Sequence, residues 1–187
     1  MTSLNKTDLL KNQPRAYLEG SLEIIGDETV FFDDETDEAF CFDENFTHKG
    51  FDVLIRGIWI QADYHSNKYL SIDNEVLPIE DNTKIRLPRK IHYAYQEWLN
   101  ELSAESFTNF LKVLNRLNYS IYDNIFCHNY GLFLPDDSPR EGVNILIFDN
   151  TDFVCNVQHH FFRARSVTKD RFEFTQTNGK RNLLVYG

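Results

Sequence analysis

The stretch that decides the fold runs from Lys84 to Leu102 and reads KIRLPRKIHYAYQEWLNEL. Before Pro88 apolar and polar side chains alternate, which is typical of a half-buried strand. After Pro88 the period lengthens to about 3.6 residues and places Tyr95 and Trp98 on one face of a helix. Two differently built parts are therefore predicted to meet near Pro88.

Short β-forming runs separated by turn residues precede Pro88. Residues 16–25 alternate cleanly between apolar and polar side chains, and Gly26-Asp27 turns the chain back. Further runs are expected at residues 29–32, 39–42, 51–60, 68–72, 76–79 and 84–87. This spacing predicts a small antiparallel β-barrel of SH3-like type over residues 14–87, after a flexible segment 1–13.

Two helices and a sheet are predicted after Pro88. A helix at 91–102 is followed by Ser103, which can cap a second helix that ends near Asn118. Strands are expected at 143–148, 153–162, 171–175 and 181–186, the last two joined by the hairpin dipeptide Asn178-Gly179. The predicted fold class is α+β, with a helical hairpin packed on an antiparallel sheet in residues 88–187.

The composition of the 187 residues is that of a folded protein, since 14% of them are aromatic. The first fifteen residues lack the apolar centre of a secretory signal, and no apolar run approaches the ~18 residues of a membrane span. The three cysteines, Cys41, Cys127 and Cys155, are odd in number and widely spaced. Reduced thiols and a cytoplasmic location are therefore expected, with no membrane association and no cofactor.

Charge is divided unevenly along the chain. Residues 1–88 carry 8 Lys/Arg against 18 Asp/Glu, whereas residues 89–187 carry 11 of each, and the net charge is −10. Nine carboxylates fall between Asp27 and Glu44 with no basic residue among them. We expect these carboxylates to lie on solvated turns, because their mutual repulsion opposes close packing.

Cysteine and histidine residues supply the first candidate site. Thiolate and imidazole groups suit Zn²⁺, and the candidate ligands are Cys127, His128, His159 and His160. No paired C-x-x-C occurs, and strand alternation places His159 on an apolar face and His160 on the opposite one. A core histidine and buried thiols are the competing interpretation. The thiol-enzyme alternative meets the objection that apolar surroundings make a thiol inert, and no catalytic residue is assigned.

A basic strip near the C-terminus is the second candidate. It comprises Arg163, Arg165, Lys169, Arg171, Lys180 and Arg181. These charges could meet phosphate, an acidic protein or the acidic half of the chain itself. The net charge of −10 disfavours nucleic acid, which stays a second alternative. The commonest nucleotide-binding, hydrolase and metalloprotease motifs are absent from the sequence.

Several short strings resemble an uncharacterised family of small proteins from Gram-positive bacilli. They are RAYLEG (15–20), SIYDNIFCHN (120–129), FDN (148–150), QHHF (158–161) and DRFEFT (170–175). The resemblance implies a bacterial cytoplasmic protein and carries no catalytic residues with it. The leading hypothesis is a non-enzymatic binding or regulatory module with a protein partner, which presents a groove or a sheet edge and exposed aromatic side chains such as Tyr17 and Tyr130.

Overall fold

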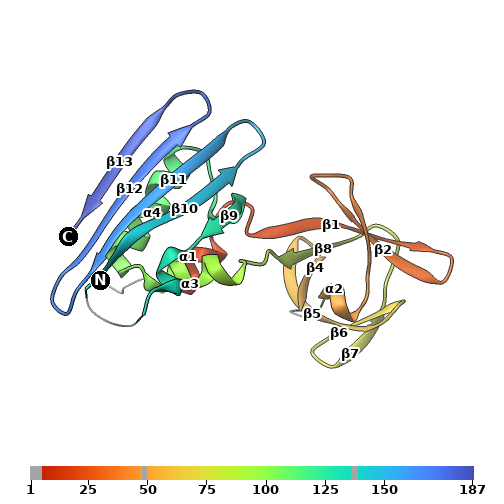
Figure 1. Cartoon of the computed structure of the whole chain (residues 1–187). Helices are drawn as coiled ribbons and strands as arrows, with labels where there is room; N and C mark the ends of the chain where they lie inside the picture. The colour runs from red at the N-terminus through yellow and green to blue at the C-terminus, as the bar shows by residue number, and fades with distance from the viewer. Residues whose placement is uncertain (1–5, 48–49, 136–138) are drawn as a thin grey trace. The chain divides into compact units, whose positions relative to one another are not determined.

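The structure of the chain, a computed structural model, describes residues 6–47, 50–135 and 139–187 (Figure 1). The chain divides into two compact units. Tyr17–Arg89 form the first, called here the sheet unit. Lys90–Gly187 form the second, the helix-backed unit, together with the N-terminal segment that ends at Ala16. The division after Arg89 lies beside the period change at Pro88.

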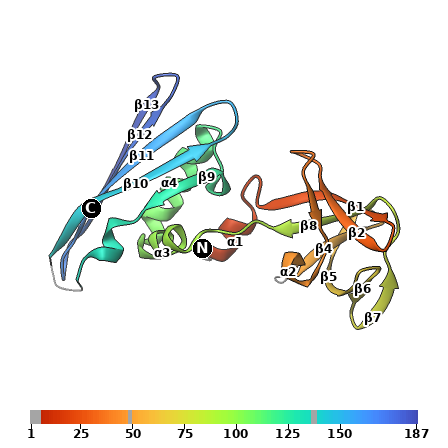
Figure 2. The same cartoon turned by 45° about the vertical axis from the view of Figure 1, so that its right-hand side comes forward.

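Antiparallel strands build the sheet unit. They are β1 (Tyr17–Ile25), β2 (Glu28–Asp33), β3 (Ala39–Cys41), β4 (Phe51–Ile55), β5 (Ile58–Ser66), β6 (Tyr69–Ile72), β7 (Glu75–Pro78) and β8 (Thr83–Pro88), with one short helix, α2 (Glu44–Thr47). Hydrogen bonds join them in the order β3-β2-β1-β8-β4-β5-β6-β7, and Figure 2 shows the row curling round. The end strands β3 and β7 are not paired with each other in the described residues. No closed barrel is found, and the SH3-like likeness stays a prediction.

The sheet unit has a hydrophobic core of its own. Leu22, Phe31 and Ile85 are fully buried there with the ring of Phe42. Gly20 lies where β1 meets β2, and a Cβ atom at this position would overlap the Phe31 ring. The glycine is thus required by the close approach of two strands.

Carboxylates of the acidic stretch are partly neutralised within the sheet unit. Asp34 accepts from Lys84 Nζ at 2.8 Å, Glu35 pairs with Arg89 Nη2 at 2.7 Å, and Asp27 pairs with Lys68. The basic partners come from the turn between β5 and β6, from β8 and from the residue after β8, which are distant in sequence. The acidic stretch includes the turns that the sequence indicated. Ion pairs with distant residues, in addition to solvation, offset the repulsion between its carboxylates.

The helix-backed unit confirms the α+β class. Its sheet has the strand order β13-β12-β11-β10-β9, with bounds β9 (Asn124–His128), β10 (Arg140–Asp149), β11 (Val154–Arg163), β12 (Thr168–Gln176) and β13 (Arg181–Tyr186). The helices are α1 (Lys6–Lys11), α3 (Tyr93–Glu101) and α4 (Ala104–Arg116), with 3₁₀ turns at Ile121–Asp123 and Tyr130–Phe133. Figure 1 shows α3 and α4 against one face of the sheet. No helix of the described residues is long and apolar enough to cross a membrane.

Aromatic rings dominate the core between the helices and the sheet. Trp98 of α3 packs edge-on against Phe110 of α4, with ring centroids 5.0 Å apart, and Phe172 of β12 contacts both rings. All three side chains are fully buried. Burial of each such ring contributes about 1.5–3 kcal/mol or more relative to exposure, so this cluster holds the helices on the sheet.

The N-terminal segment contains helix α1 and contacts the rest of the helix-backed unit, whereas the flexibility expected for residues 1–13 stays a prediction. Lys6 Nζ of α1 donates to the carbonyl oxygens of Leu99 and Leu102 at 2.9 and 2.7 Å. Arg15 forms an ion pair with buried Asp123. The sequence pattern did not predict α1, because a helix of six residues shows too little periodicity to be recognised. The residues that α1 contacts lie about a hundred positions away in the sequence.

Candidate functional site

A buried polar network surrounds His159 on the helix-facing side of β11. Trp98 Nε1 donates to His159 Nδ1 at 2.8 Å, and Asn144 Nδ2 lies 3.2 Å from the same nitrogen. On the other side of the ring, His159 Nε2 lies 2.9 Å from Asp170 Oδ1. Phe172 stacks flat on the imidazole, with centroids 4.4 Å apart. Both ring nitrogens of His159 therefore have hydrogen-bond partners, and one face of the ring is covered by Phe172.

The partners fix the protonation state of this histidine. An indole N–H is only a donor, so Nδ1 must accept and Nε2 must carry the proton. Burial lowers the pKa of His159, although the hydrogen bond to Asp170 opposes that effect. The ring is a neutral Nε2–H tautomer whose donor and acceptor positions are both occupied.

Asp170 is the charged centre of the network. It also accepts from Ser106 Oγ at 2.6 Å and from Arg163 Nη2 at 2.6 Å. Burial opposes ionisation of the carboxyl, but the hydrogen bonds from His159 and Ser106 and the charge of Arg163 outweigh it, so the pKa of Asp170 falls to about 2. A histidine bonded to a fixed carboxylate resembles part of a catalytic triad, yet the second nitrogen faces Trp98 and not a nucleophile.

The four candidate metal ligands are not gathered into one cluster. Cys127 and His159 face the helices, whereas His128 and His160 lie on the opposite face of the sheet, in register with outward residues of β10 and β12. Within residues 6–47, 50–135 and 139–187, no group of three or more His, Cys, Asp or Glu side chains could hold a metal ion. The metal site stays a prediction that this geometry does not favour.

The thiols are poorly suited to nucleophilic attack. Burial raises the pKa of Cys127 to about 12 and that of Cys155 to about 11, and the latter is fully buried. Cys41 is exposed, in the edge strand β3 of the sheet unit. A thiolate is the reactive form, so these pKa values support the interpretation of Cys127 and Cys155 as core residues.

The basic strip is divided by the structure. Arg163 is engaged by Asp170 and by the Lys169 carbonyl, and Arg171 pairs with Glu173 at 2.8 Å. Lys169 and Arg165 lie toward one end of β12, whereas Lys180 and Arg181 follow its other end. Lys169 and Thr175, the residue paired with Arg181, are six positions apart in β12, which is about 20 Å in a strand. The strip therefore does not form one continuous basic patch.

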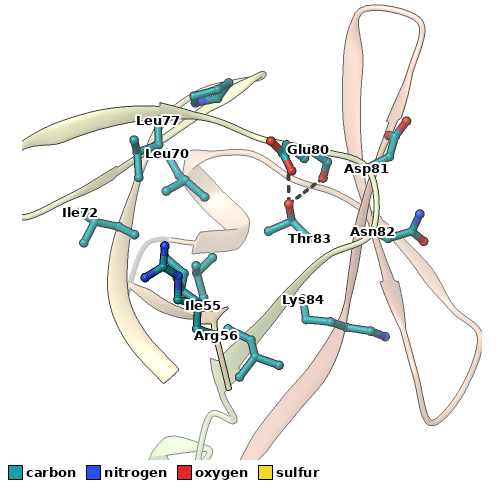
Figure 3. Close-up of a pocket in the computed structure, with 13 residues that line it drawn as sticks. Ile55, Arg56, Leu70, Ile72, Leu77, Glu80, Asp81, Asn82, Thr83 and Lys84 are labelled. Carbon is teal, nitrogen blue, oxygen red and sulfur yellow. Dashed lines mark hydrogen bonds between the residues drawn. The ribbon is translucent and has the colours of Figure 1, made fainter. Parts of the chain in front are cut away.

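The sheet unit contains a groove of about 510 Å³, shown in Figure 3. Its apolar wall comes from Ile55, Leu70, Ile72 and Leu77, and Leu70 and Leu77 face each other across the β6–β7 ladder. Leu70 is buried, but Leu77 is 37% exposed. An apolar wall that water still reaches is a common property of binding sites.

Charged and polar groups form the rim of the groove. The Glu80–Thr83 loop lies opposite the leucines in Figure 3, and Thr83 Oγ1 donates to the Glu80 carbonyl at 2.6 Å. Asp81 accepts from the Ile24 backbone N–H at 2.7 Å, which anchors the loop to β1. Arg56 adds a cation from the two-residue turn between β4 and β5, where its φ is 49°. The loop is thus held in place while the Glu80 carboxylate remains exposed.

Sequence reasoning missed the groove and most of the network. The groove residues come from strands and loops that only the sheet order brings together. Asp170 could have been found, because it shares the alternation of Phe172 and Phe174, which marks a core position. Trp98 was predicted on the apolar face of its helix, but the sequence did not indicate that it contacts His159, and it did not indicate the contact of Asn144 with the same ring.

The comparisons with known proteins agree with one another. A family model described as "Protein of unknown function (DUF2777)" matches residues 4–186. The uncharacterized protein YisN of Bacillus subtilis (strain 168) is 26% identical over 181 residues, which cover 97% of this chain and 91% of that protein. No solved structure matches the chain.

Proposed function

The chain belongs to the DUF2777 family of proteins of unknown function, and we propose that it is a non-enzymatic binding protein. Its partner is a protein, and the groove of the sheet unit holds an extended, positively charged segment of that partner. The observation that carries this proposal is an open apolar groove with an exposed carboxylate at its rim, in a unit of strongly negative charge.

Charge supports a cationic partner. Residues 17–89 carry 17 Asp/Glu against 6 Lys/Arg. Such an excess attracts basic segments over a distance of about a Debye length and raises the association rate. Within the groove, Glu80 offers a local contact for a Lys or Arg side chain. Arg56, at the other side, would donate hydrogen bonds to a carboxylate of the same segment.

The groove wall supports an apolar anchor beside the basic residues. Ile55, Ile72 and Leu77 are apolar and only partly covered in the sheet unit. Burying one leucine-sized side chain against them contributes about 1.5–3 kcal/mol, which a peptide of moderate affinity needs. The segment that fits therefore combines one bulky apolar side chain with neighbouring Lys or Arg.

The proposal that the protein is not an enzyme is supported by the surroundings of its histidine and cysteine side chains. His159 has both nitrogens engaged, and the pKa values of Cys127 and Cys155 are raised by burial. A cytoplasmic location and an SH3-like description of the sheet unit belong to the same proposal. Its free thiols suit a reducing compartment, and its curled row of strands suits a small barrel.

Selection from a library of displayed random peptides tests the function. We expect enriched peptides with a bulky apolar residue next to Lys or Arg, and binding that weakens with salt. Leu77→Asp should weaken binding of the selected peptide at least tenfold, because it puts a charge in the apolar wall. Glu80→Lys should weaken it by a smaller factor and reduce the salt dependence.

Matched variants on the same strand serve as controls. Val76 is 47% exposed on the opposite face of β7, so Val76→Asp should bind as wild type. Glu75→Lys changes the net charge as Glu80→Lys does but lies outside the groove. Selected peptides without basic residues, or equal binding by Leu77→Asp and Val76→Asp, would contradict the proposal.

A further inference from the structure

In the part of the chain that the structure describes, the two sheets have four edge strands, and three of them are protected against pairing. β3 has only three residues, and β7 carries Glu75 and ends in Pro78. β9 is irregular opposite Ile147 and Phe148, and its Phe126 carbonyl accepts from Asn124 Nδ2 at 2.9 Å. Short length, charge, proline and irregularity are the devices that keep edges from pairing with other chains.

The fourth edge, β13, has none of these devices in its centre. Residues 182–186 read NLLVY, with no charge and no proline. Leu183 and Val185 are 65% and 61% exposed on the face away from the helices, and Leu184 and Tyr186 pack partly on the core from the other face. No described strand pairs with the outer side of β13. The strand is a regular, apolar template for strand addition.

We propose that β13 pairs antiparallel with β13 of a second copy of this chain, so that the two sheets continue into one another. A twofold axis through Leu184 gives the longest overlap of residues 182–186. In that register Leu183 lies opposite Val185 of the partner subunit on the open face. On the helix-facing side, Leu184 meets Leu184 of the partner subunit at the axis, so each face of the interface includes an apolar contact, as a self-complementary interface requires.

Charges under the sheet support the same register. Arg116 at the end of α4 donates to Asn182 Oδ1 at 3.2 Å. Glu105 in the first turn of α4 precedes Ser106, whose hydroxyl donates to Asp170, the residue paired with Tyr186 in the β12–β13 ladder, so Glu105 lies at the Tyr186 end of β13. The twofold axis places Asn182 opposite Tyr186 of the partner subunit. Arg116 of each copy is thereby brought toward Glu105 of the partner subunit, which favours the second copy as occupant.

Net charge does not oppose this pairing. Residues 1–16 and 90–187 carry 13 Lys/Arg and 12 Asp/Glu, so the helix-backed unit is almost neutral. The excess of carboxylates belongs to residues 17–89. The edge that lacks protection therefore belongs to the unit in which electrostatic repulsion between copies is weakest.

Sedimentation of the full chain across micromolar to millimolar concentrations tests the proposal. We expect a reversible rise from the 22.1 kDa monomer to twice that mass. Leu183→Lys should weaken dimerisation at least tenfold, because a lysine on an edge strand disfavours strand addition. Gln158→Lys adds the same charge to the same open face within the interior strand β11 and should leave the dimer unchanged.

A charge exchange tests the register. Arg116→Glu and Glu105→Arg should each weaken dimerisation, and the double variant should recover most of the loss. Amide exchange of β13 should also slow as the wild-type concentration rises. A wild type that stays monomeric, or a dimer that Leu183→Lys does not weaken, overturns the proposal. Peptide binding by the groove would be unaffected by either result, since it uses the other unit.

Discussion

At the residue scale, the informative side chain is His159, whose environment permits one protonation state. Trp98 and Asn144 both direct N–H groups at Nδ1, so a proton there would face two donors. The sequence indicated that His159 faces the core, and this was confirmed by its 1% exposure. It could not indicate the partners, because Trp98 is 61 residues away and adjacency across a helix and a strand is set by packing.

The protonation state predicts how stability depends on pH. Burial lowers the pKa of folded His159 below its ordinary value of 6.5, so the unfolded chain binds the proton more readily. The contribution of neutral His159 to the free energy of unfolding is fully present above about pH 6.5, and it is lost as the pH falls below that value. Urea unfolding should give a smaller free energy at about pH 5.5 than at about pH 7.5.

A pair of variants separates His159 from its neighbours in this measurement. Asp170 has a pKa of about 2, so its own protonation lies outside that pH interval. His159→Gln should flatten the pH dependence, whereas His160→Gln, at the outward position next to it, should retain it. An equal slope in both variants would exclude His159 as the group responsible.

The charge of Asp170 predicts a second effect. Asp170→Asn keeps the shape but leaves the Arg163 guanidinium, 15% exposed, without its carboxylate. We expect a loss of about 2–4 kcal/mol in the free energy of unfolding at neutral pH. Glu173→Gln, on the same strand but 42% exposed, should change it by less than about 0.5 kcal/mol. Denaturant unfolding of both variants is the measurement.

At the element scale, long periodic segments were predictable and short ones were not. Helix α4 begins after Ser103, whose side chain accepts from the Ser106 backbone N–H as the sequence indicated. Strand β9 was not among the predicted strands. The capping box of Ser120 and Asp123 does form, but it holds only three residues before the chain becomes extended. Such a short element is decided by pairing with β10, which a local pattern does not show.

Helix α1 supports a prediction about the C-terminal end of α3. Lys6 Nζ donates to carbonyl groups that the end of α3 leaves without intrahelical partners. Lys6→Met keeps the apolar stem and removes the donor, so we expect a loss of about 1 kcal/mol in the free energy of unfolding. Faster amide exchange in α3 should accompany it. Lys11→Met, at the exposed end of α1, should leave both unchanged, and an equal effect of the two variants would refute the capping role.

At the scale of the whole molecule, charge distinguishes the two units. The sheet unit carries 17 Asp/Glu against 6 Lys/Arg, and several of its ion pairs, such as Lys84–Asp34, are exposed. Exposed pairs contribute little, about 0–1 kcal/mol each, whereas the net excess repels itself. The division of charge was visible in the sequence, but the pairing of individual carboxylates depended on strand order.

Salt should therefore stabilise the sheet unit selectively. Screening reduces the net repulsion more than it weakens the few exposed pairs. Core amides of β1 and β8 should exchange several-fold more slowly in high salt than in low salt. Core amides of β10 and β11, in the nearly neutral unit, should change little. A uniform change in both groups of amides would argue against charge repulsion as the cause.

The path of the backbone has a consequence for synthesis. Tyr17 lies opposite Pro88 in the ladder of β1 and β8, so the chain enters and leaves residues 17–89 at neighbouring points, like an insertion in a host. Arg15 emerges from the ribosome 108 residues before Asp123, its partner. Residues 17–89 can therefore fold first, whereas the segment that ends at Ala16 can pack on its own unit only after most of the chain has been translated. A variant in which a short linker joins Ala16 to Lys90, without residues 17–89, should still fold as the helix-backed unit.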